Sequence, residues 1–266
     1  MMNSNEYFAN FQRICLSILA QSGNCDDSQT RFRAATTVPE MVSAWKHFLD
    51  GLLHEVPAQV IAAFADFYPT YRTDINRAGI YYNEAPPTDS INAIILIGDT
   101  PSSDAESSKK ATVPDSLTSG RNPLSITGRH RVYVLGNCPV LCFDHCNVFI
   151  NATTAHVCIY QNCRASIEAG TLYANGRSVV HGKGNITCYE STTIHLVGGT
   201  LTDHGHLDIY AYNDAVIHSY FATAPTSRRR ITLKDKAVLL PLSSMESPSK
   251  ATVLGDSVSE KSSIVK

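Results

Sequence analysis

The chain has 266 residues, of which 43% are hydrophobic and 17% are charged, and its net charge is −2. This near-neutral balance argues against a general binder of nucleic acids or of anionic membranes. No apolar run approaches the ~18 residues that a membrane-spanning helix needs. The N-terminal stretch MMNSNEYFANF has no basic segment followed by an apolar one. We therefore expect no signal peptide, a cytoplasmic location and reduced cysteines.

Residues 1–80 predict a small helical domain. Apolar residues recur there at helical spacing, and Thr37-Val38-Pro39-Glu40 has the pattern of a capping box at a helix start. Pro57 opens a further helix, which Tyr68-Pro69 is expected to end before a short helix over 70–78. The apolar stripes indicate the core of a helical bundle rather than contacts to a cofactor.

Residues 81–130 predict a strand followed by a flexible linker. The strand is INAIILIGD, and the linker is TPSSDAESSKKATVPDSLTSGRNP, which is rich in serine, proline and charge. At the other end of the chain, residues 242–266 have the composition of a disordered tail.

Residues 131–241 predict a parallel β-helix. Pairs of apolar residues at alternate positions recur about every eight residues, with Gly, Asn and Asp between them. No unit is long enough to bury its own face, so the units must stack. Three steps give a coil of about 23 residues, and the apolar residues then align in three inward columns: Val140, Ala165, Ile186 and Ile209; Val148, Leu172, Ile194 and Ile217; Val157, Val180 and Leu201.

The fold class expected from these patterns is α+β, with a helical domain followed by a short three-sided parallel β-helix of about four coils. A two-sided solenoid with coils of about sixteen residues is the alternative. Antiparallel hairpins are less favoured, because Asn-Gly turns at hairpin spacing are scarce and Asn175-Gly176 is the only Asn-Gly pair in the region.

Three cysteines lie at spacings of four in NCPVLCFDHC, residues 137–146. Because side chains alternate along a strand, Cys138 and Cys142 share the inner face, and Cys146 takes the inward position of the next step. Zinc sites more often use cysteine pairs on turns that converge on one point. We expect these cysteines to be buried, unpaired and free of metal.

His204, His206 and Asp208 alternate in sequence and could leave one strand face together, which makes them weak candidates for metal ligands. An exposed solenoid strand has the same pattern, and no further ligand can be named. We therefore expect no metal and no cofactor.

A more informative outward column is formed by Phe149, Tyr173, His195 and His218, at intervals of 24, 22 and 23 residues. In a three-step coil these rings would stack on one exposed face. Stacked rings offer a flat platform for a sugar ring or for a protein partner. The alternative is a ladder that only stabilises neighbouring coils.

The segments LDIYAYNDAVIHSY and AHVCIYQNCRASIEA resemble repeat units of the form A-x-V-x-A-Y-[DN]-x-A. The stretch FLDGLLHEVP…DINRAGIYYNEAPP is similar to a lead-in to such repeats. The chain thus resembles short-repeat parallel β-solenoid proteins preceded by a helical domain, which are mostly uncharacterised bacterial and mobile-element proteins. This resemblance covers about half of the chain and implies a fold but no activity.

The sequence shows no serine-hydrolase elbow, no catalytic Ser/His/Asp order and no H-E-x-x-H motif. We expect a non-catalytic binding or structural protein that presents a solenoid surface to a protein or carbohydrate partner, without binding nucleic acid or a membrane. The alternatives are a carbohydrate-active β-helix enzyme of the lyase or glycosidase type and a self-assembling β-helix scaffold.

Overall fold

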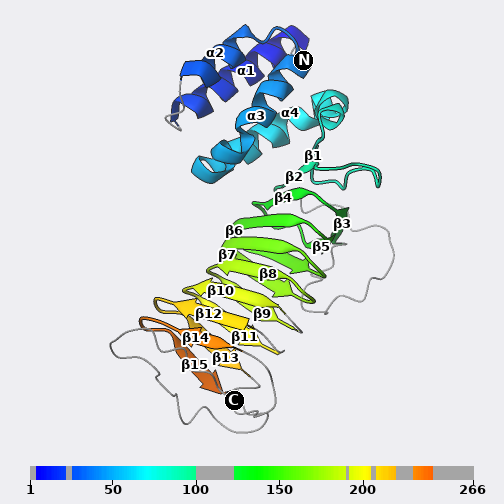
Figure 1. Ribbon diagram of the computed structural model, residues 1–266. Coiled ribbons are helices and arrows are strands. Elements are labelled where there is room, and N and C mark those ends of the chain that lie inside the picture. Colours follow the sequence, from blue (N-terminus) through cyan, green and yellow to red (C-terminus); the bar gives the residue numbers. More distant parts are fainter. Residues whose placement is uncertain are drawn as a thin grey trace.

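A computed structural model describes residues 4–21, 26–99, 123–189, 192–204, 208–219 and 230–241. A small helical domain leads into a long parallel β-solenoid, with the helices at one end of the stack (Figure 1), and this confirms the expected fold class. The expected tail over 242–266 and most of the expected linker lie outside the described residues. Among the helices that are described, none is both long and apolar enough to cross a membrane.

The described part of the helical domain has four helices, α1 Ser4–Gln21, α2 Asp26–Ala34, α3 Val38–Glu55 and α4 Pro57–Arg77. The capping box is confirmed, because the Thr37 hydroxyl accepts from the Glu40 amide and the Glu40 carboxylate accepts from the Thr37 amide at 3.2 Å. Helix α4 does not end at Pro69 but kinks at Tyr71, where φ is −116° and ψ is 19°. It therefore joins two segments that the sequence predicts as separate helices. Helix α2 was not predicted.

The solenoid consists of two parallel sheets that face each other. The first sheet contains, in spatial order, β1 Ile80–Tyr82, β2 Ile94–Ile97, β4 Arg131–Val134, the first part of β6 Asn147–Ile159, the first part of β7 Arg164–Ala174, β8 Val179–Gly182, β10 Thr193–Val197, β12 Asp208–Tyr212 and β14 Ile231–Leu233. The second contains β3 Leu124–Gly128, β5 Val140–Asp144, the last parts of β6 and β7, β9 Asn185–Cys188, β11 Thr200–Asp203, β13 Val216–Ser219 and β15 Val238–Pro241. From β4 onward, each of seven coils gives one strand to each sheet.

The predicted numbers of sides and of coils were wrong, because a coil contains two steps rather than three, and about seven coils form instead of about four. Val148 pairs with Ala165, which pairs with Val180, all in the first sheet. The two-sided alternative therefore describes the protein, and the equivalent inward positions of successive coils are Val132, Val148, Ala165, Val180, Ile194 and Ile209. Each expected inward column alternates between the sheets: Ala165, Ile209, Val148, Ile194 and Val180 belong to the first sheet, and Val140, Ile186, Leu172, Ile217, Val157 and Leu201 to the second.

The inward direction of these apolar residues is confirmed. They are all nearly inaccessible to solvent and belong to one continuous core between the two sheets. Strands β1, β2 and β3 also belong to the sheets, so the solenoid begins at Ile80, well before residue 131.

The helical domain covers the outer side of the first sheet at its N-terminal end. Leu96, Tyr133 and Phe149 are equivalent outward positions on three neighbouring strands, and all three pack into the core of the helical domain. The strands β2 and β4 are thus buried on both sides. This packing accounts for the continuous apolar run of β2, which lacks the alternation of a half-exposed strand.

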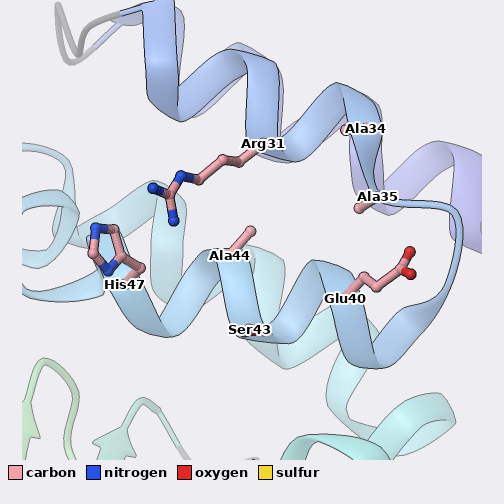
Figure 2. A pocket seen from close by; sticks show the side chains of 7 residues that line it. All are labelled: Arg31, Ala34, Ala35, Glu40, Ser43, Ala44 and His47. Atoms are coloured by element: carbon pink, nitrogen blue, oxygen red, sulfur yellow. The ribbon is translucent and has the colours of Figure 1, made fainter.

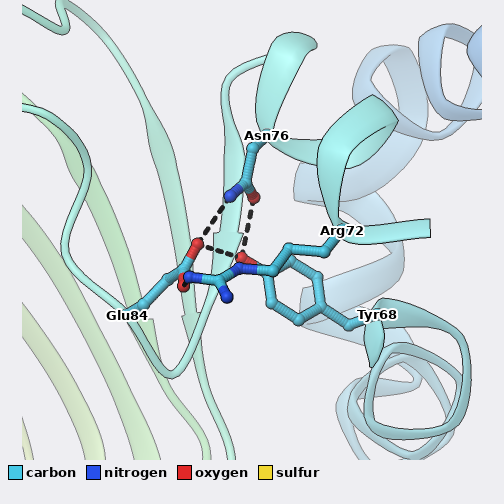
Figure 3. A network of polar contacts seen from close by, with 4 residues as sticks. All are labelled: Tyr68, Arg72, Asn76 and Glu84. Carbon is cyan, nitrogen blue, oxygen red and sulfur yellow. Dashed lines mark hydrogen bonds and ion pairs between the residues drawn. The ribbon is translucent and has the colours of Figure 1, made fainter. Parts of the chain in front are cut away.

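A polar network also joins α4 to the segment after β1 (Figure 3). The Glu84 carboxylate accepts hydrogen bonds from the Tyr68 hydroxyl and from Asn76 Nδ2, and it pairs with Arg72. Partial burial disfavours the charge on Glu84, but these three donors outweigh burial and lower its pKa. Burial and the nearby carboxylate raise the pKa of Tyr68 to about 12, so the hydroxyl remains a donor.

Candidate functional site

The four residues of the predicted binding ladder all follow a buried inward residue and are partly exposed, but they do not form one ladder. Phe149 and His195 lie on the first sheet, and Tyr173 and His218 lie on the second. Phe149 is further removed because it packs against the helical domain. The prediction that these four rings stack in one column is therefore wrong. That they bind a ligand stays a prediction.

The outer side of the first sheet carries a shorter ladder of rings among charged side chains. The His195 ring stacks on Tyr210 with centroids 4.8 Å apart and planes 8° apart, and His181 lies on the other side at 6.1 Å. Charged residues within or directly beside strands of the first sheet are exposed: Arg164, Glu168, Lys183, Asp208 and Arg230. This surface thus mixes positive, negative and ring groups.

The outer side of the second sheet differs because the outward positions of its central strands carry no charged side chain. Within the second-sheet parts of β6, β7, β9, β11 and β13, no outward position is Asp, Glu, Lys or Arg. The outward residues are His156, Cys158, Thr171, Tyr173, Asn185, Thr187, Thr200, Thr202, Val216 and His218. Four of these ten are threonines, so this face offers hydroxyl groups rather than ions.

Rings and hydroxyls on this face are arranged in register. Tyr173 pairs with Thr187, Thr187 with Thr202, and Thr202 with His218, so the four occupy consecutive strands at a spacing of ~4.8 Å. Beside them, the rings of Tyr189 and His204 stack with centroids 4.9 Å apart and planes 15° apart. The following partly exposed residues are together called the aromatic–hydroxyl surface: Tyr173, Thr187, Tyr189, Thr202, His204 and His218.

Two acidic residues close in sequence to His204, Asp203 and Asp208, lie within the described residues but not on this surface. The Asp203 side chain points into the core, where it is fully buried and accepts from the Ser219 hydroxyl at 2.5 Å. Asp208 belongs to the first sheet and accepts from the Arg230 amide. Burial lowers the pKa of His204, with Asp203 opposing this effect, so His204 is neutral at pH 7.

The weak metal candidates do not share a strand face. His204 follows β11 in the second sheet, Asp208 opens β12 in the first sheet, and His206 lies outside the described residues. The predicted alternation fails because the chain turns from one sheet to the other between these positions. No group of three His, Cys, Asp or Glu side chains within the described ranges is placed to hold a metal ion.

The expected burial of Cys138, Cys142 and Cys146 is confirmed, and these thiols are not joined in disulfides. Cys142 lies in the inward column of the second sheet, between Ile126 and Ile159. Hydrogen bonding with Cys142, together with burial, raises the pKa of Cys146 to about 12. Thiols held in this protonated state are poor nucleophiles and poor metal ligands.

Cys146 also belongs to a column of buried donors at the long turns. Its sulfur lies 3.4 Å from the Phe143 carbonyl oxygen and 3.3 Å from that of Gly128 in the preceding coil. Ser178 and Thr192 take the equivalent place in later coils. The Ser178 hydroxyl lies 2.8 Å from the carbonyl oxygen three residues earlier, and the Thr192 hydroxyl lies 2.9 Å from its counterpart. Cys163 lies between Cys146 and Ser178 in this column. The cysteines therefore satisfy turn carbonyls as the hydroxyls do.

An open hollow of about 440 Å³ lies between α2 and α3 (Figure 2). The Arg31 guanidinium points toward His47 at one end, Glu40 lies at the other, and Ala44 of α3 lies between them. The Glu40 carboxylate already accepts from the amides of Thr36 and Thr37 at the start of α3. The hollow thus has weaker ligand-binding chemistry than the aromatic–hydroxyl surface.

Sequence reasoning identified Tyr173 and His218 but missed the residues between them. Thr187 and Thr202 escaped notice because the longer coil of three steps puts them on other sides. The signal that could have found them was the short, nearly constant interval that leads from Tyr173 to Thr187 and from Thr187 to Thr202. No family model, curated protein or solved structure matches the chain.

Proposed function

We propose that this protein is a non-catalytic binding protein, and that the aromatic–hydroxyl surface of its solenoid is the part that contacts the ligand. The observation that carries the proposal concerns the outward positions of the central strands in the second sheet. These positions carry no charge, and their rings and hydroxyls are in register. Lys, Arg, Asp and Glu usually lie on protein surfaces, and the outer side of the first sheet does carry such residues.

The solenoid suits this role because it holds the surface rigid. Tyr173, Thr187 and Thr202 stand on strands that are hydrogen-bonded to a neighbour on each side. Their backbone does not need to be ordered when a ligand binds, which removes one cost of association.

The alternatives have less support. Most glycosidases use paired carboxylates beside the substrate, but Asp203 is buried in the core and Asp208 lies on the other sheet. A scaffold that stacks through its coil ends needs open ends, whereas the helical domain lies at one end of the stack (Figure 1). We also propose a cytoplasmic location, which fits the seven described cysteines, none of which forms a disulfide.

The proposal is tested by comparing three baits in affinity capture from cells and from cell-wall extracts. The baits are the wild-type protein, a surface variant with Tyr173→Ala and Tyr189→Ala, and a control with His195→Ala and Tyr210→Ala on the first sheet. We expect a ligand that the wild type and the control retain and the surface variant loses. Equal capture by all three, or loss in the control alone, would contradict the proposal.

A further inference from the structure

We infer that the ligand of the aromatic–hydroxyl surface is an uncharged oligosaccharide or polysaccharide, bound across successive coils. This inference rests on the proposed function and assigns it a ligand class.

The absence of charge decides against ionic ligands. Phosphate and carboxylate groups are bound in proteins by Arg and Lys side chains, which form the strongest hydrogen bonds to them. The outward positions of the second sheet between His156 and His218 carry neither residue, and they carry no acid that would attract a cation. These described positions therefore favour a ligand that is neutral where it crosses the strands.

The groups present match the chemistry of a sugar. A sugar ring has an apolar face of C–H groups and an edge of hydroxyls, which need a flat ring and hydrogen-bonding partners respectively. Tyr173 and the stacked pair of Tyr189 and His204 supply rings. Thr187 and Thr202 supply hydroxyls, each of which can both donate and accept. A lipid or an apolar protein face would leave these hydroxyls without partners.

The arrangement favours a chain of sugars over a single one. Tyr173, Thr187, Thr202 and His218 extend over three intervals between strands, or ~14 Å along the solenoid. The Tyr189 and His204 rings lie beside the two middle strands, so ring and hydroxyl contacts continue along the row. A glycan that runs parallel to the solenoid axis would meet a new contact on every coil.

The test is affinity electrophoresis in native gels that contain one polysaccharide each. Neutral polymers (β-1,3-glucan, β-1,4-glucan, α-glucan, mannan, galactan and xylan) are compared with acidic ones (polygalacturonate and alginate). We expect at least one neutral polymer to retard the wild type. Loss of two stacking rings in Tyr173→Ala with Tyr189→Ala should weaken that binding about tenfold or more. The first-sheet control, His195→Ala with Tyr210→Ala, should bind like the wild type.

A second variant, Thr187→Val with Thr202→Val, keeps the shape and the β-branching of the side chains and removes both hydroxyls. It should also bind more weakly, and it decides the question if the alanine variant does not fold. Thermal melting of each variant establishes that it is folded.

Three results would overturn the inference. The first is retardation by the acidic polymers alone or by none of the neutral ones. The second is equal binding by the wild type and both surface variants. The third is a dimer in solution that the surface variants dissociate, because a second copy would then be the occupant. If no neutral glycan binds but a protein is captured only by an intact surface, the glycan inference fails and the proposed binding function stands. If no capture depends on the surface, both fail.

Discussion

Small side chains that donate hydrogen bonds stabilise the turns that lead from the second sheet back to the first. Cys146 and Ser178 hold the same place in different coils, and each lies against a partly buried carbonyl of the turn. We expect Cys146→Ser to change the free energy of unfolding by less than about 1 kcal/mol, because the donor is kept. Cys146→Val should cost about 1–3 kcal/mol, because it leaves those carbonyls without a partner. Urea unfolding measures both, and Ser178→Cys is the reverse control. A serine variant as unstable as the valine variant would refute this explanation.

His130 begins the same column and makes stability depend on pH. Its Nδ1 accepts from the Ala93 amide at 3.2 Å, and its Nε2 lies 3.1 Å from the Thr127 carbonyl oxygen. The ring must therefore be neutral, and burial lowers its pKa. In the unfolded chain the ring gains a proton near pH 6.5, before the folded form does. The stability that His130 contributes is thus complete above about pH 6.5 and is lost as the pH falls toward the lower, folded-state pKa.

We expect the melting temperature to fall between pH 7.5 and pH 5.5, and to fall less in His130→Asn, which has no titrating ring. The asparagine variant should be the less stable of the two at pH 7.5, because it does not reproduce both hydrogen bonds. Melting curves at five pH values measure the difference between the two proteins. Two parallel profiles would show that His130 does not titrate in this range.

At the scale of the strands, glycines decide where the chain can change sheets. Gly182 ends β8 with φ at +129°, and a Cβ there would lie 1.9 Å from the Ile167 carbonyl oxygen on the adjacent strand. Gly182→Ala should therefore destabilise the protein by about 3 kcal/mol or more. Gly51 lies within α3 with nothing near its missing Cβ, so Gly51→Ala should stabilise by ~0.5–1 kcal/mol. Denaturant midpoints of the two variants should shift in opposite directions, and a shift in the same direction would contradict this account.

These turns also explain which part of the fold could be read from the sequence. Apolar alternation every eight residues fixes the strands between residues 131 and 219 and their inward residues, and these were predicted, whereas β1 and β3 were not. It does not fix how many steps close a coil, because a coil of two steps and a coil of three steps both place the same apolar residues inward. The turn angle makes that choice, and its signal was the spacing of Gly170, Gly184 and Gly199, which all have positive φ. The intervals between these glycines are too short for a coil of three steps and fit a coil of two.

For the candidate site, the predictable part was smaller. The outward direction of Tyr173 and His218 follows from strand alternation alone. Their neighbours depend on the coil length, so Thr187 and Tyr189 could not be assigned to the same surface without the register of the strands. The helical domain was predicted as a unit, but its packing over β2 and β4 depends on tertiary contacts.

For the whole molecule, the helical domain divides the first sheet into a covered part and an open part. Tyr133 and Tyr210 occupy the same outward column, but only Tyr133 is packed into the helical core, where it is 7% exposed and its ring lies 6.0 Å from that of Phe149. We expect Tyr133→Ala to lower the free energy of unfolding by about 3 kcal/mol, as for other large buried rings. Tyr210→Ala should cost less than about 1.5 kcal/mol, because it loses one ring contact on an open face. Chemical unfolding of the two variants tests this, and equal losses would mean that the helices do not stabilise the sheet beneath them.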